Sequence, residues 1–214
     1  NVTGWLILAN VLFFILAIII TLIYPDSWKY IILQPSNILQ GEYLWTFITS
    51  MFMHAGIFHL LINMFVLFSL GNFCEKIIGG KRFFWFYIIS GLAAGVLFVL
   101  LAGMYGTMPL GERIFGSPDI GGVGASGAIF AIAGLFMILT PNLKFSIIFF
   151  PFFTLPACIM IPIVLFATWF VSAGTGLPVG NTAHFGGLLA GIVYGLFLKK
   201  RYSRKIAMLN RMIQ

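Results

Sequence analysis

Few polar side chains lie within the long apolar runs of this sequence, and Ser126 is one of them. It stands in the stretch Gly-Gly-Val-Gly-Ala-Ser-Gly-Ala at residues 121–128, where a glycine-rich entry gives way to an apolar run. A serine in the first turn of a helix lies near free backbone N–H groups and the positive end of the helix dipole, which favour an alkoxide or an oxyanion. By itself, Gly-x-Ser-Gly is more typical of a small-residue packing stripe. This motif alone leaves both interpretations open.

His184 begins another apolar run, and small residues recur along both of these runs. After His184 they stand at Gly187, Gly191 and Gly195, and after Ser126 they stand at Gly127, Ala131 and Gly134. Such stripes let two helices approach closely. Close packing would bring Ser126 and His184 within hydrogen-bonding reach, so that the imidazole could take the serine proton and pass it to a leaving amine. No acid within the membrane is available to orient the histidine, so the pair would be a dyad and not a triad.

His59 and Asn63 are four residues apart and therefore share one face of a helix. They could point together at one target, or they could be hydrogen-bonding contacts between helices. For this pair alone the two interpretations have about equal weight. His54 lies nearer a loop, and we expect it to play a structural part, such as bonding a backbone carbonyl.

Metal and cofactor chemistry is disfavoured by the residues present. The chain has three histidines and two cysteines, and it contains neither a His-Glu-x-x-His motif nor paired aspartates within an apolar run. Cys74 and Cys158 lack Cys-x-x-Cys spacing, so we expect two buried apolar thiols. We expect no metal and no cofactor.

The elements that must position these side chains are membrane helices. Mean hydropathy is +1.07, and only 8% of the 214 residues are charged, against about 25% in soluble domains. A helix needs about 20 apolar residues to cross the hydrocarbon. Six runs fit, and the first is too long for a signal peptide: Trp5–Tyr24, Met51–Phe73, Phe83–Tyr105, Val123–Pro141, Pro156–Val171 and Thr182–Leu198. The stretch Phe145–Phe153 is too short to span, so we expect a connection or a membrane-dipping segment.

The charges give an orientation for this all-α integral membrane protein. With both termini cytoplasmic, ten of the twelve Lys and Arg residues lie inside, and only Lys29 and Arg113 lie outside. We expect one membrane domain at residues 1–198 and a basic cytoplasmic tail at residues 199–214. Because the tail directly follows a spanning helix, membrane lipid is its expected partner, and nucleic acid is not. The location that fits best is the cell membrane.

Three motifs together resemble the signatures of the rhomboid intramembrane serine proteases. They are His59-Leu-Leu-Ile-Asn63, Gly124-Ala-Ser126-Gly127 and Ala183-His184-Phe-Gly-Gly187-Leu-Leu-Ala-Gly191. The resemblance covers about residues 40–198 and implies a six-helix rhomboid-like bundle. It implies Ser126 as nucleophile, His184 as base, and an oxyanion hole made by the Ser126 N–H and the side chains of His59 and Asn63. Gly124 would shape the loop before the nucleophile.

Two positions depart from the family pattern. The family often has Trp-Arg in the first outer loop, where this chain has Trp45-Thr46, so that loop's usual internal bonds are in doubt. Members commonly place a tyrosine one turn after the nucleophile to stack on the histidine, and here it is Phe130. Stacking can survive this change. Neither change removes a reacting group.

The resemblance also implies partners and moving parts. Substrates of rhomboid-like proteins are single-spanning membrane proteins cut near their outer end. The aromatic-rich loop Pro25–Ser50 should lie in the outer interface. The segment Ser172–Gly180 would be a mobile cap, and the fifth helix would be a side gate. The oligomeric state is open.

Two other functions would fit parts of this sequence. A catalytically silent rhomboid-fold protein could bind membrane clients, but such proteins lack the serine or the histidine. A small transporter or channel could also hold polar residues on broken helices. Against that, the polar groups cluster on one side of the bilayer and form no path across it.

Overall fold

The computed structural model describes residues 1–147, 150–175 and 180–213. Five of its helical segments are long and apolar enough to cross a membrane: Val2–Ile23, Ile57–Ile78, Gly80–Tyr105, Ala157–Thr175 and Asn181–Arg201. These are α1, the α4–α5 segment, α6, α9 and α10. A sixth apolar helix, α8, is shorter and covers Ser126–Leu139. The described chain is thus mostly helical, and its six apolar helical segments agree with the predicted membrane bundle.

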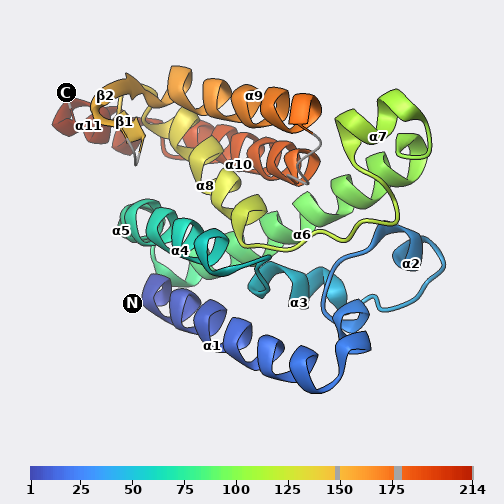
Figure 1. Cartoon of the computed structure of the whole chain (residues 1–214). Coiled ribbons are helices and arrows are strands. Elements are labelled where there is room, and N and C mark those ends of the chain that lie inside the picture. Colours follow the sequence, from blue (N-terminus) through green and yellow to red (C-terminus); the bar gives the residue numbers. More distant parts are fainter. Residues whose placement is uncertain (148–149, 176–179, 214) are drawn as a thin grey trace.

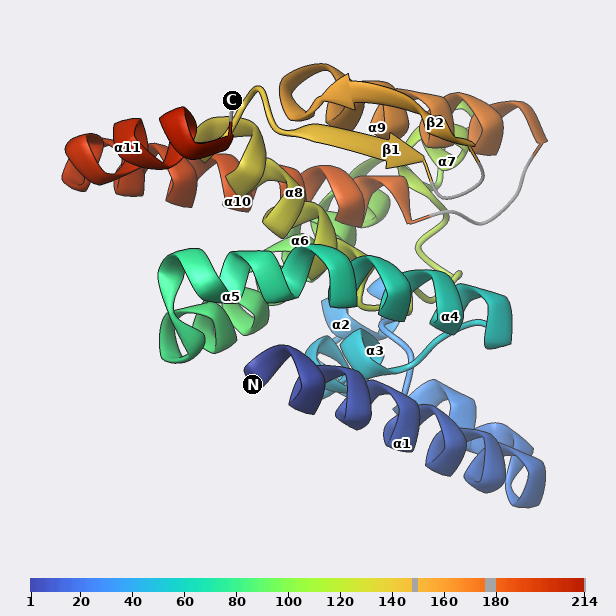
Figure 2. The same cartoon turned by 90° about the vertical axis from the view of Figure 1, so that its left-hand side faces the viewer.

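The helices are arranged around α8. In Figures 1 and 2, α1 lies along one edge, α9 lies along the opposite edge, and α8 lies between them beside α10. Ten of the fourteen residues of α8 are buried. At 1.5 Å per residue, α8 is about 21 Å long, against about 30 Å for the hydrocarbon core of a bilayer. Because α8 is short, one of its ends can lie within the membrane.

The second spanning segment is not the continuous helix that the apolar run Met51–Phe73 predicted. The chain forms α3 at Thr46–Phe52, leaves helical geometry at residues 53–56, and then forms α4 at Ile57–Val66. A π-helical turn, η2, covers Leu67–Gly71, and α5 covers Asn72–Ile78. Hydropathy did not reveal the break because the residues on both sides of it are apolar. Gly56, a poor helix former, stands at its end.

A carboxylate fixes the start of α1. The Glu75 carboxylate of α5 accepts hydrogen bonds from the backbone N–H groups of Val2 (2.8 Å) and Thr3 (2.9 Å) and from the Thr3 hydroxyl (2.8 Å). The first N–H groups of a helix have no partner within the helix, and the helix dipole favours negative charge there. Glu75 therefore joins α1 to α5 at the end of the bundle where the N-terminus lies (Figure 1).

The loop between α1 and α3 contains two short helices, η1 at Pro25–Tyr30 and α2 at Pro35–Leu39. Thr46, where the family often has arginine, is buried, and its hydroxyl has no partner among the described residues. Other groups make the internal bonds of the loop. The Trp45 indole N–H donates to the carbonyl of Tyr30 (3.0 Å), and the Thr49 hydroxyl donates to that of Ile31 (2.9 Å).

The second half of the chain corrects several predicted boundaries. A short helix that was not predicted, α7, covers Pro109–Phe115. The stretch after α8 forms an antiparallel hairpin of β1 (Lys144–Ile147) and β2 (Phe150–Pro156). Helix α9 continues through Pro162 and includes the first four residues of the predicted cap, and residues 176–179 of that cap lie outside the described residues.

The basic segment after the last span is also helical. Helix α10 continues to Arg201, and α11 covers Ser203–Ile213. The Asn210 side-chain amide donates to the carbonyl of Leu139 at the end of α8 (2.7 Å), and Ile206 is buried. The segment therefore packs against the bundle. Of the two cysteines, Cys74 is buried as predicted, but Cys158 is exposed because it lies on the outer face of α9.

Candidate active site

The seam between α8 and α10 is formed by backbone contacts at glycine. A Cβ atom at Gly187 would overlap the carbonyl oxygen of Gly127, and one at Gly191 would overlap that of Ala131. At Gly134 it would lie 2.5 Å from the carbonyl oxygen of Leu188. The predicted packing of the two small-residue stripes is confirmed, and side chains larger than hydrogen do not fit at its closest points.

This seam brings Ser126 and His184 together. Ser126 is the first residue of α8, and His184 lies in the first turn of α10. The Ser126 Oγ and the His184 Nε2 are 2.8 Å apart, which is hydrogen-bonding distance. The serine is half-buried and the histidine is buried. The hydroxyl can donate to the ring nitrogen if the His184 proton is on Nδ1.

The His184 ring is held by stacking and not by an acid. Its Nδ1 atom is buried and has no hydrogen-bond partner among the described residues. The Phe130 ring stacks on the imidazole with centroids 4.5 Å apart and an interplanar angle of 18°. Because Phe130 lies one turn after Ser126 on α8, the predicted stack survives without the tyrosine hydroxyl. A stacked aromatic face also favours an imidazolium ion.

The loop before Ser126 depends on Gly124. Its φ angle is +126°, a region that side chains disfavour, and a Cβ atom there would lie 2.9 Å from the His59 Cε1 and 3.6 Å from the Ser126 Oγ. The Gly124 N–H donates to the carbonyl of Ser50 (2.8 Å), so the loop is bonded to α3. Gly124 therefore gives the His59 ring access to the space beside the serine.

His59 and Asn63 lie on the same face of α4 but have different contacts. The His59 Nδ1 accepts from the N–H of Ala55 (3.3 Å), so in the neutral ring the proton is on Nε2. That nitrogen would lie 3.2 Å from a Cβ atom at Gly124. The Asn63 amide donates to the His59 carbonyl of its own helix (2.9 Å), and its NH₂ group carries a second hydrogen.

His54 has the structural role that was expected, and ring packing is the main form it takes. Both ring nitrogens of His54 are buried without a hydrogen-bond partner among the described residues. The ring instead lies edge-on to His59, with centroids 5.1 Å apart, and edge-on to Phe14 of α1 at 6.4 Å. His54 fills the space between α1 and the site.

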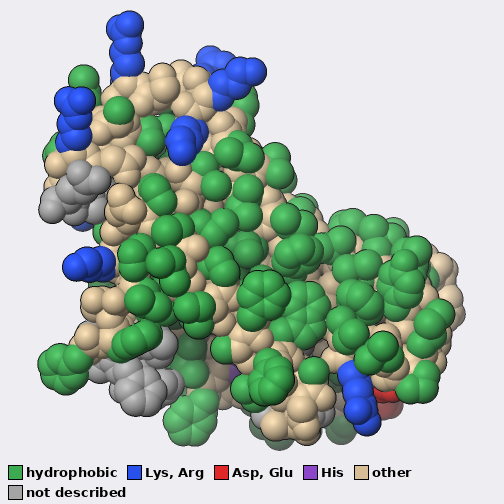
Figure 3. Space-filling model, turned by 90° about the horizontal axis from the view of Figure 1, so that it is seen from above, with side chains coloured by type: hydrophobic (Ala, Val, Ile, Leu, Met, Phe, Trp, Pro, Cys, Tyr) green, Lys and Arg blue, Asp and Glu red, His purple; other side chains and the backbone are tan. Residues whose placement is uncertain are grey.

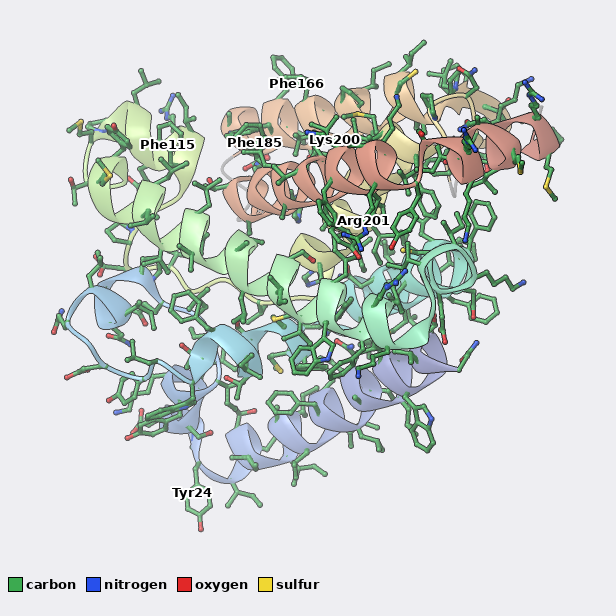
Figure 4. All side chains as sticks on the ribbon, turned by 180° about the vertical axis from the view of Figure 1, so that it is seen from behind. Tyr24, Phe115, Phe166, Phe185, Lys200 and Arg201 are labelled. Atoms are coloured by element: carbon green, nitrogen blue, oxygen red, sulfur yellow. The ribbon has the colours of Figure 1, made fainter. Side chains whose placement is uncertain are left out.

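Two side chains that sequence reasoning missed bond α10 and α9 to the end of α7. The Thr182 hydroxyl donates to the carbonyl of Phe115 (3.0 Å), and the Trp169 indole N–H of α9 donates to that of Ile114 (2.7 Å). Both acceptors lie at the end of α7, and Figure 4 shows Phe115 of α7 facing the start of α10, where Phe185 is labelled. The polar Thr182, two residues before His184, was the available signal.

Comparison with known proteins agrees with this arrangement. Residues 41–201 match the family model of the rhomboid domain. The chain belongs to the rhomboid family. It is 30% identical over 187 residues to Rhomboid protein 1, mitochondrial, of Saccharomyces cerevisiae, covering 85% of this chain and 50% of that protein. It is 24% identical over 179 residues to Rhomboid protease GlpG of Haemophilus influenzae, covering 83% of this chain and 81% of that protein.

A third rhomboid relative, the Putative rhomboid protease YdcA of Bacillus subtilis, is 37% identical over 108 residues, which are 50% of this chain and 47% of that protein. The chain spans about half the length of several eukaryotic relatives. Some of these are mitochondrial by name, which does not support the predicted cell-membrane location.

Proposed function

We propose that this rhomboid chain is an intramembrane serine endopeptidase, with Ser126 as nucleophile and His184 as general base. The observation that carries the proposal is the 2.8 Å distance between the Ser126 Oγ and the His184 Nε2. A serine hydroxyl is a weak nucleophile until an adjacent base takes its proton. The family includes a relative named as a protease, and both reacting groups are present here.

Ser126 and His184 would supply the nucleophile and the proton transfers for both halves of the reaction. The Ser126 Oγ attacks the peptide carbonyl carbon while the His184 Nε2 takes the hydroxyl proton. The imidazolium then gives that proton to the leaving amine, and the carbonyl remains bonded to Ser126 as an ester. Water attacks the ester with His184 again as base, which releases the acid and regenerates the serine.

The carbonyl oxygen gains negative charge in each step and needs hydrogen-bond donors. The Ser126 N–H is at the start of α8, where helical N–H groups have no partner within the helix. The His59 Nε2–H lies on the same side of Gly124 as the serine. The second hydrogen of the Asn63 amide would be a third donor. Such donors lower the barrier because they are already oriented when the charge appears.

We propose that both termini face the cytoplasm and that substrates are cut near the outer face. Figure 3 shows Lys and Arg side chains gathered at one end of the molecule, and a lone basic side chain beside an acidic one at the opposite end. Basic residues favour the cytoplasmic side. Ser126 lies at the end of α8 that points away from these basic side chains. The proposed substrates are single-spanning membrane proteins, whose scissile bonds would enter the site from the membrane.

A fluorophosphonate probe applied to the detergent-solubilised chain separates a protease from a protein that only binds membrane clients. We expect Ser126 to be labelled covalently and a model single-spanning substrate to be cleaved in proteoliposomes. The Ser126→Ala variant is the matched control and should show neither. A folded wild-type chain with no labelling and no cleavage would favour client binding.

A further inference from the structure

A continuous groove lies between α6 and α10, outside the seam that holds Ser126 and His184. One part has a volume of about 630 Å³ and is lined by apolar residues that include Leu97 and Val193. The other part, of about 460 Å³, is lined by Lys81, Arg82 and aromatic side chains. Ala190 and Tyr194 line both parts, so the two are one groove.

Cations lie at one end of this groove. Lys81 and Arg82 stand at the start of α6 and are exposed. The Arg82 guanidinium lies 5.8 Å from the centre of the Tyr202 ring, and the Arg201 guanidinium lies equally close to the same ring. Figure 4 shows Arg201 on the side of α10 that faces α6. No carboxylate is among the described residues that line the groove.

The groove has the dimensions of a lipid leaflet. From Gly186 to Tyr194 is eight residues of α10, or about 12 Å along the helix, and Arg201 lies about 10 Å further. One leaflet of the hydrocarbon core is about 15 Å thick. An acyl chain would lie along the apolar part, and a phosphate would reach the arginines. A soluble anion has no acyl chain and would not fill the apolar part.

We propose that this groove binds one anionic phospholipid of the leaflet at the basic end of the protein. The phosphate lies among Lys81, Arg82 and Arg201, and an acyl chain lies between α6 and α10 toward Leu97. Basic pockets between membrane helices on the cytoplasmic side are suited to anionic headgroups. Tyr194 lines both parts of the groove, between the cations and the apolar part. This site does not depend on the proposed peptidase activity.

The test is a lipid titration of the delipidated full chain, followed by native mass spectrometry. The probes are phosphatidylglycerol and phosphatidylcholine with identical acyl chains. Removing two cations beside an anionic headgroup should weaken binding about 30-fold. We therefore expect Lys81→Gln/Arg82→Gln to lose about that factor for phosphatidylglycerol and to bind phosphatidylcholine as the wild type does.

Two further variants separate the groove from diffuse charge. Lys144→Gln/Arg211→Gln removes the same charge at exposed positions outside the groove and should change phosphatidylglycerol binding less than about 3-fold. Ala190→Phe fills the groove and should weaken the binding of both lipids. Thermal unfolding shows that each variant is folded. A wild type without preference for phosphatidylglycerol, or equal losses in the two double variants, would overturn the proposal.

Discussion

Helix α10 presents small residues on two faces, and the two faces meet their neighbours differently. Gly187 and Gly191 lie directly on backbone carbonyls of α8, whereas Gly186 and Ala190, each one residue earlier, line the groove against α6. Consecutive residues point about 100° apart around a helix. Helix α8 has glycine and alanine at the contact, so the backbones meet. Helix α6 comes close at Gly186, where a Cβ atom would lie 3.1 Å from the Ala94 Cα. Beside Ala190 it presents larger side chains that include Trp85 and Phe86, and a hollow remains there. The partner helix decides whether a small-residue stripe becomes a seam or a groove.

The largest loss of activity is expected when the reacting pair in the seam is removed. Ser126→Ala and His184→Ala should each lower substrate cleavage on the order of 10⁴-fold or more, and the double variant should lose little beyond that, because the two groups act as a unit. Cleavage kinetics in proteoliposomes measure this, with thermal unfolding as the check on folding. Wild-type turnover in Ser126→Ala would exclude the proposed nucleophile.

Asn63 tests whether α4, besides α8 and α10, contributes a group to the reaction. Removing one oxyanion donor costs about 10²–10³-fold in kcat, so Asn63→Ala should slow cleavage by that order while fluorophosphonate labelling still occurs. The Asn63 amide also bonds its own helix. Unchanged kcat in this variant would show that the helix bond is its whole role.

Gly191 tests whether activity requires the close packing of α8 against α10. A side chain there must displace the Ala131 carbonyl, and misplacing reacting groups by about 1 Å can cost on the order of 10²-fold in rate. Gly191→Leu should therefore lose about that factor and melt at a lower temperature. Gly195→Leu should lose less, because it meets the Ile138 side chain instead of backbone.

The control for the seam is Leu189→Ala on the outer side of α10. The Leu189 side chain is 41% exposed and lines the groove instead of the seam, so activity and melting temperature should stay close to wild type. A loss as large as that of Gly191→Leu would mean that α10 is sensitive at every face. The contrast between seam and groove would then have no functional meaning.

Among the variants expected to lose activity, the smallest loss concerns the ring that stacks on His184. Phe130→Leu keeps an apolar side chain but removes the aromatic face, and a stacked cation contributes about 0.5–2 kcal/mol, so kcat should fall about 10-fold. Phe130→Tyr keeps the stack and should stay within about 3-fold of wild type. Measuring kcat and KM separately distinguishes an effect on the imidazolium from an effect on substrate binding. A rise in KM alone would indicate a role in substrate binding.

Much of the fold and of the candidate site could be predicted from residue type and spacing. Long uncharged runs predict membrane spans, because lipid excludes charge and unpaired backbone groups. The four-residue spacing of glycines predicted the contact between Ser126 and His184, because equal periods place small residues on one helical face. These features are local or periodic, so one chain suffices to show them.

The tertiary structure decided what depends on a partner. The sequence of α10 alone does not show whether Gly186 or Gly187 faces α8. The exposure of Cys158 could not be predicted either, because it depends on what covers α9. Hydropathy gives no signal for the break before α4, because the break depends on which hydrogen-bond partners the backbone of residues 53–56 has. Residue type and spacing indicated which residues could react and, within a few residues, which segments enter the membrane. Only packing decided their distances and the groove between α6 and α10, because both depend on side chains distant in the sequence.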